Sequence, residues 1–316
     1  MAYLEHLLVL ASIYIILSAS LNIIIGLTGM LNLGHAAFFG IGAYISALLA
    51  KVIGLSWIAS VIFGIIGAAL AGVLIGIPCL RLRGDYLAIA TLGFGEIIRA
   101  IMKNWVSVTR GPLGIPGIPK PELLGYRFAS VNEFLVLTIV IMAISVWLIH
   151  RIIHSPFGRV LRSIREDEIA SLSLGKDIVK YKLLALAIGA GFAGLAGSLY
   201  AHYITFIDPT TFTFTETVLM VSMVVLGGMG SLTGSIIGAI ILTLLPEPIR
   251  FVQLPTHIVA ASRQIIYSVA LILLMLFRPT GILGEDPNRK NKILYFFKHL
   301  AWKIGLRTNK PENTLM

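Results

Sequence analysis

The chain has 316 residues, of which 57% are hydrophobic and 13% are charged, whereas an ordinary soluble domain has about 25% charged residues. Basic residues outnumber acidic ones by 25 to 15, but 15 of the 25 lie in two segments, 151–182 and 278–316. The composition therefore predicts an integral membrane protein. A nucleic-acid-binding domain and a second soluble domain are both excluded, because the charges lie between apolar blocks.

Apolar blocks long enough to approach a membrane span recur along the whole chain. A helix needs about 20 apolar residues to cross a bilayer core, and the runs are continuous, which excludes a transmembrane barrel. We expect an all-α polytopic membrane protein with eight to ten transmembrane or re-entrant helices. The eight blocks are 4–26, 33–50, 55–80, 86–102, 133–153, 183–203, 217–245 and 262–277.

The charged segments set the orientation of the spans. The positive-inside rule places 151–182 and the tail from 278 onward in the cytoplasm. If 183–203, 217–245 and 262–277 each crossed the membrane once, the tail would end on the external side. We therefore expect 217–245 to enter the membrane and return to the same side, broken at Gly227–Gly234. Broken backbone at membrane depth requires surrounding protein or a water-filled cavity. Parity puts the N-terminus outside if 33–50 crosses fully.

Glycine interrupts apolar sequence in both halves, at Gly26–Gly34 and again at Gly227–Gly234. Paired interrupted helices indicate a transport site between repeats, although close helix packing through small residues is an alternative. Glu96 is also three residues from Arg99, which favours a structural ion pair. The candidate pathway residues are Asn32, His35, Thr91, Glu96, Gly227, Gly228 and Gly230.

Several patterns indicate what the chain does not do alone. Cys79 is the single cysteine, and neither a metal-ligand cluster, nor a catalytic arrangement, nor a Walker ATP motif occurs. We therefore expect no enzyme activity, no metal and no cofactor in this chain. The small residues at four-residue spacing in 189–201 predict close packing on one helix face, and 292–310 predicts a basic amphipathic helix on the inner leaflet.

Longer motifs carry a family resemblance. The chain resembles the LivM-type inner-membrane permeases of ABC importers for branched-chain amino acids, and the resemblance extends from the first span to about Gly284. The motifs that carry it are Gly26-Leu27-Thr28-Gly29, Asn32-Leu33-Gly34-His35-Ala36-Ala37-Phe38-Phe39-Gly40, Arg83-Gly84-Asp85-Tyr86-Leu87-Ala88, Arg165-Glu166-Asp167-Glu168-Ile169-Ala170, Leu226-Gly227-Gly228-Met229-Gly230-Ser231 and Arg278-Pro279-Thr280-Gly281-Ile282-Leu283-Gly284.

The resemblance implies an ABC importer permease fold over 1–284, and the charge pattern predicts a basic amphipathic cytoplasmic tail over 285–316. It implies a coupling loop at about 155–182 that docks on a cytosolic ATPase, with a short helix from about Glu166 to Leu174. The residues assigned to coupling are Arg165, Glu166, Asp167, Glu168, Ala170 and Gly175.

The resemblance also implies partners. These are a second homologous permease, two ATPase subunits that use ATP and Mg, and an external substrate-binding protein, all at a bacterial or archaeal plasma membrane, or at the inner membrane of a Gram-negative cell. From the residues alone, an ion- or proton-coupled secondary transporter stays open, with Glu96, His35 or Glu216 as coupling groups. A membrane scaffold without transport would leave the glycine breaks unexplained.

Overall fold

The computed structural model describes residues 2–80, 82, 84–123, 125–128 and 130–245, together with the positions 269, 272 and 281–283. The expected span 262–277 and the expected amphipathic tail 285–316 therefore lie outside the described residues, apart from 269 and 272. The α-helices of the described part are α1 (Ala2–Thr28), α2 (His35–Leu48), α3 (Trp57–Cys79), α4 (Asp85–Asn104), α5 (Val106–Thr109), α6 (Val131–His154), α7 (Pro156–Glu166), α8 (Glu168–Ser173), α9 (Ile178–Ile204), α10 (Phe214–Gly227) and α11 (Leu232–Leu244).

The remaining elements are short. A π-helical turn, Leu49–Ile53, continues α2 and ends at Gly54 in the left-handed conformation, and a 3-10 turn covers Gly111–Leu113. Four two-residue strands form two antiparallel pairs: β1 (Ile115–Pro116) with β4 (Phe206–Ile207), and β2 (Glu122–Leu123) with β3 (Tyr126–Arg127). These pairs order the loop between α4 and α6.

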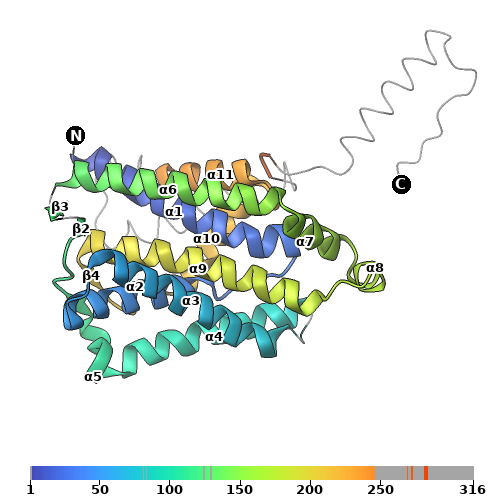
Figure 1. Cartoon of the computed structure of the whole chain (residues 1–316), viewed down its shortest axis with the longest axis horizontal. Helices are drawn as coiled ribbons and strands as arrows, with labels where there is room; N and C mark the ends of the chain where they lie inside the picture. Colours follow the sequence, from blue (N-terminus) through green and yellow to red (C-terminus); the bar gives the residue numbers. More distant parts are fainter. Residues whose placement is uncertain are drawn as a thin grey trace, which may run out of the picture.

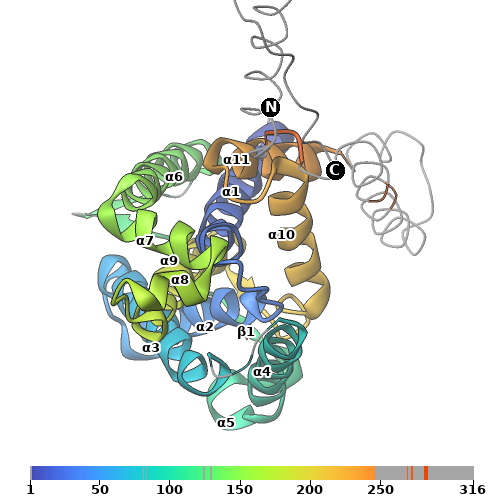
Figure 2. The same ribbon diagram turned by 90° about the vertical axis from the view of Figure 1, so that its right-hand side faces the viewer.

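The long helices run side by side, with the N-terminus at one end of the bundle and α7 and α8 at the other (Figure 1). Viewed from the α8 end, α1 lies between α9, α10 and α11 (Figure 2). In the apolar part of α1, 83% of the residues are buried, whereas in the corresponding parts of α3 and α6 only 28% and 22% of the residues are buried. The fold is therefore built around α1, and α3 and α6 present apolar side chains to the surroundings.

Five helices are long and apolar enough to cross a membrane: α1, α2 with its π-helical turn, α3, α6 and α9. The structure thus supports a polytopic helical membrane protein but does not confirm the expected total of eight to ten spans. The fourth predicted block forms α4, which is not among the five. It carries Asp85, Glu96, Arg99 and Lys103, and charged groups are costly within a bilayer.

Small residues on α9 allow close contacts with three neighbouring helices. A Cβ at Gly189 would meet Ile24 of α1, a Cβ at Gly194 would meet Gly64 and Ala68 of α3, and a Cβ at Gly197 would meet Phe39 of α2. The predicted packing role is confirmed, and glycine also allows close contact at Gly194, outside the predicted set. Helix α9 is surrounded, so its glycines serve different faces.

The predicted break in the block 217–245 is confirmed. Helix α10 ends at Gly227, α11 begins at Leu232, and Gly227 packs on Gly234 while Met223 packs on Gly238. These contacts run in opposite directions along the two helices and define an antiparallel hairpin. At about 1.5 Å per residue, each arm is only about 20 Å long, so the block enters the bundle and returns.

Candidate functional site: two broken segments around α1

The first break connects α1 to α2 and turns back into the bundle. Helix α1 ends at Thr28, yet the hydroxyl of Ser20 lies 2.9 Å from Nε2 of His35, the first residue of α2. Ser20 precedes Thr28 by two helical turns, about 12 Å. Helix α2 therefore begins inside the protein. The backbone N–H of Leu33 donates to Oγ1 of Thr91 at 3.0 Å, which attaches this break to α4.

The second break, Gly228–Ser231, is held by two distant parts of the chain. The N–H of Gly230 donates to Oδ1 of Asn22 on α1 at 2.9 Å. The N–H groups of Ile282 and Leu283 donate to the last carbonyls of α10, those of Leu226 and Gly227, each at 2.9 Å. Those carbonyls have no partner within the helix itself.

Glycine is required at two positions of this second break and at Gly281, which packs against it. Gly228 and Gly230 have φ values of 112° and 88°, which side chains with a Cβ rarely adopt. A Cβ at Gly281 would lie 2.6 Å from the Cα of Gly228. The motif Gly281-Ile282-Leu283 therefore closes the end of α10 by direct backbone contact.

One face of α1 carries a polar group at every fourth residue toward the hairpin. The Tyr14 hydroxyl donates to Oε2 of Glu216 at 3.0 Å, the Ser18 hydroxyl donates to the Ser235 carbonyl at 3.1 Å, and Asn22 accepts from Gly230. Sequence reasoning missed Tyr14, Ser18 and Asn22. Their four-residue spacing within an otherwise apolar span was a usable signal, because polar groups inside a membrane are costly.

Three buried polar atoms near the breaks have no hydrogen-bond partner among the described residues: Nδ2 of Asn22, Nδ2 of Asn32 and Nδ1 of His35. An unpaired buried polar group costs roughly 1–3 kcal/mol. Hydrogen-bonding capacity at this depth is what a route for a polar solute requires. The same groups are consistent with bound water.

The structure brings most of the predicted pathway residues together. Thr91, Asn32 and His35 lie at the first break, and Gly227, Gly228 and Gly230 lie at the second, with α1 between the two sets. Glu96 lies on α4, as Thr91 does, and its carboxylate accepts from Nε of Arg99 at 3.0 Å. The expected ion pair on α4 is confirmed.

The segment 155–182, expected in the cytoplasm, forms the short helices α7 and α8 at the end of the bundle (Figure 1). Helix α8 is bounded by Asp167, whose Oδ1 accepts from the N–H groups of Ile169 and Ala170 at 2.8 and 3.0 Å, and by Gly175 with φ 75°. The predicted short helix is confirmed with one correction. Glu166 is the last residue of α7, because the extended backbone of Asp167 separates the two helices.

Helix α8 is attached on one side and open on the other. Ser171 is fully buried and hydrogen-bonded to Ser163 of α7 at 2.8 Å, and Glu168 forms an ion pair with Lys182 of α9. Large apolar side chains nevertheless face outward from it: Ile169 is 73% exposed, Leu172 60% and Leu174 74%.

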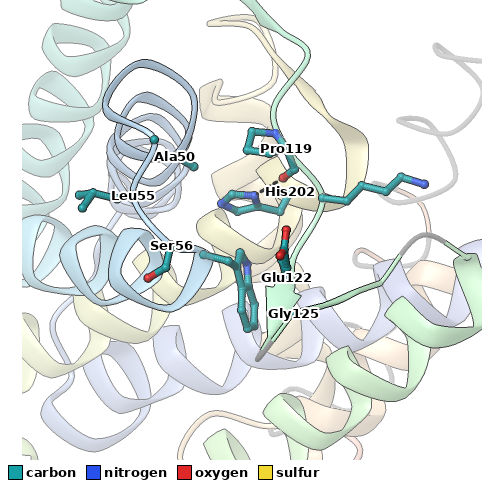
Figure 3. A pocket seen from close by; sticks show the side chains of 10 residues that line it. Ala50, Leu55, Ser56, Pro119, Glu122, Gly125 and His202 are labelled. Atoms are coloured by element: carbon teal, nitrogen blue, oxygen red, sulfur yellow. Dashed lines mark hydrogen bonds between the residues drawn. The ribbon is translucent and has the colours of Figure 1, made fainter.

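The opposite end of the bundle carries a pocket of about 450 Å³ between the start of α3, the end of α9 and the loop before α6 (Figure 3). His202 is fully buried there. Its Nδ1–H donates to the Pro119 carbonyl at 2.7 Å, so its Nε2 accepts from the Ser46 hydroxyl at 2.9 Å. His202 thus anchors the loop to the end of α9.

These features define a class of protein, a polytopic helical membrane protein with two interrupted segments meeting in its core. The sequence matches the family described as the permease component of branched-chain amino acid transport systems over residues 3–277. The chain belongs to that family.

Individual relatives agree with this assignment. The high-affinity branched-chain amino acid transport permease LivM of Salmonella typhimurium is 41% identical over 86% of this chain and 68% of its own length, and LivM of Escherichia coli is 41% identical over 87% and 68%. A probable LivM of Methanocaldococcus jannaschii is 28% identical over 87% and 91%. No solved structure matches the chain.

Proposed function

We propose that this chain is the membrane-spanning permease subunit of an ATP-driven importer for branched-chain amino acids or a related small solute. A substrate-binding protein on the outside delivers the solute, and the chain pairs with a second homologous permease. Two cytosolic ATPase subunits bind ATP and Mg and supply the energy. The complex lies in a bacterial or archaeal plasma membrane, which is the inner membrane in a Gram-negative cell.

The observation that carries the energy-coupling part of this proposal is the exposed apolar face of α8. Ile169, Leu172 and Leu174 are largely exposed on a helix within the most basic loop of the described chain. Apolar groups clustered on a polar surface favour a protein partner. An ATPase cleft that encloses this helix buries them, and Glu166 and Asp167 lie at the edge of that contact, whereas the guanidinium of Arg165 donates to the Gly26 carbonyl.

The attachment of α8 allows its displacement to reach the spans. The Ser163–Ser171 hydrogen bond joins it to α7, and the Glu168–Lys182 ion pair joins it to the start of α9. ATP binding and hydrolysis then bias the permease between outward- and inward-facing states through differential contacts with α8.

Reconstitution in liposomes tests the function directly. Radiolabelled leucine uptake by the full complex is expected only with ATP on the cytosolic side and the binding protein on the other. Uptake that persists without both, and that follows a proton or sodium gradient, would contradict the proposal and favour the secondary transporter.

Two substitutions test the coupling contact. Glu168→Lys replaces the ion pair between Glu168 and Lys182 with two ammonium groups that repel each other. Gly175→Val forces a β-branched residue into the left-handed conformation that Gly175 adopts. Both are expected to reduce co-purification of the ATPase and leucine uptake. Gly93→Ala is the matched control, because nothing lies within 4 Å of a Cβ at that position. Unchanged association and uptake in both variants would remove the coupling assignment.

A further inference from the structure

Arg165 extends from α7 onto the backbone of both broken segments. Its Nη1 donates to the carbonyl of Gly26, near the end of α1. A Cβ at Gly29 would lie 3.4 Å from Cγ of Arg165, and a Cβ at Gly230 would lie 2.8 Å from its Nη1. One side chain therefore contacts the start of the first break and the middle of the second.

The end of α1 provides a physical reason for an arginine at this point. The last carbonyls of a helix lack partners within the helix and carry partial negative charge. The N–H of Gly29 donates to the Ile25 carbonyl, and the Thr28 hydroxyl donates to the Ile24 carbonyl. The next carbonyl, that of Gly26, receives the guanidinium.

The two broken segments are in direct contact beneath this guanidinium. A Cβ at Gly26 would lie 2.6 Å from the backbone nitrogen of Gly230, and Asn22 already accepts a hydrogen bond from that nitrogen. Glycine at 26 and 230 thus lets the two backbones meet, and the planar guanidinium lies where they do. A lysine keeps the positive charge but lacks the planar guanidinium and its fixed donor directions.

We propose that Arg165 is a positioning residue that holds the cytoplasmic ends of the two broken segments together and links them to α7. This inference rests on the proposed transport function, because it identifies the residue through which movement of α7 reaches the core. When α7 moves with α8, the guanidinium leaves Gly26 and Gly230, and the two segments separate. When α7 returns, the contact forms again and closes the cytoplasmic side.

An ordinary helix-capping role for Arg165 predicts a different outcome. Loss of a cap lowers the stability of α1 and reduces ATPase rate and uptake in proportion to the protein lost. Loss of a link between α7 and the breaks leaves the complex assembled and separates ATP hydrolysis from uptake. The number of leucine molecules taken up per ATP hydrolysed therefore distinguishes the two.

The test uses the full complex in liposomes with Arg165→Gln and Arg165→Lys. The matched control is Arg159→Gln, because Arg159 is exposed on the same helix and its guanidinium makes no hydrogen bond to the described residues. Arg165→Gln is expected to lower leucine uptake per ATP about tenfold, which is the change in an equilibrium constant expected when one hydrogen bond from a charged group is lost. Arg165→Lys is expected to lie between it and wild type, and Arg159→Gln to match wild type. An unchanged ratio in Arg165→Gln would overturn the proposal.

A second measurement does not depend on transport. Leu27 is 1% exposed and packs among α1, α6 and α7, so a cysteine there in a Cys79→Ala background reports separation of α7 from α1. Arg165→Gln is expected to raise its labelling rate by a membrane-impermeant maleimide from the cytosolic side about tenfold. Equal labelling with and without Arg165 would overturn the proposal even if ATP-driven uptake is observed. Faster labelling of Arg165→Gln than of wild type, in a complex whose wild-type form shows no ATP-driven uptake, would support the link and contradict the transport function instead.

Discussion

The crossing of α2 and α9 offers a stringent test of the packing. Gly197→Ala adds one methyl group at a point where its Cβ would lie 1.9 Å from the carbonyl oxygen of Phe39 and 2.9 Å from the nitrogen of Ala43. Both obstacles are backbone atoms, which no side-chain rotation can move away. Since such contacts are essentially never shorter than 3.0 Å, the two helices must move apart by about 1 Å.

The cost of that movement sets the expected magnitude. Overpacking a close-packed core costs about 1–3 kcal/mol, and alanine recovers about 0.5–1 kcal/mol of helix propensity. The middle of these ranges leaves a net cost of about 1 kcal/mol, so the variant is expected to unfold about 2–4 °C below wild type. Gly191→Ala is the control on the same helix, because its Cβ finds its nearest neighbour, Ile65, at 3.5 Å in ordinary contact.

The assay uses the single cysteine as an internal reporter. Cys79 is buried, so a dye that fluoresces on reacting with a thiol follows thermal unfolding of the purified protein in detergent. Gly197→Ala should shift the midpoint down, while Gly191→Ala should leave it unchanged or raise it slightly. Equal midpoints for the two variants would refute the close approach of α2 and α9.

Other contacts lead to further expectations. Asp167→Ala removes the acceptor for two N–H groups of α8 and should cost about 1 kcal/mol of helix stability, reducing uptake several-fold, whereas Asp167→Asn should retain most of it; equal uptake in both would contradict the capping role. Tyr14→Phe and Glu216→Leu should each lower the thermal midpoint, and the double variant should lose less than the sum because the two groups are hydrogen-bonded; strict additivity would contradict the pair. His202→Ala removes the donor to Pro119 and should speed proteolysis of the neighbouring loop in purified protein; an unchanged cleavage rate would show that this contact does not anchor the loop.

Much of the architecture could be predicted because its physical cause is local. A span must be about as long as the bilayer is thick, so the bounds of α1, α3, α6 and α9 follow from apolar run length. The break near Gly230 followed from charge placement and parity. The helix after Asp167 followed from its acidic start and from Gly175, which suit the two ends of a short helix.

The arrangement at the core depended on contacts between residues distant in sequence. Apolar length does not specify which face of α1 meets the hairpin, so the roles of Asn22 and Tyr14 were missed. Closure of α10 by 281–283 joins segments more than fifty residues apart. Composition and charge placement thus determined that the chain lies in a membrane and is interrupted twice. Only the tertiary structure decided that both interruptions meet on α1 under Arg165, because helix rotation and backbone approach arise from packing between segments.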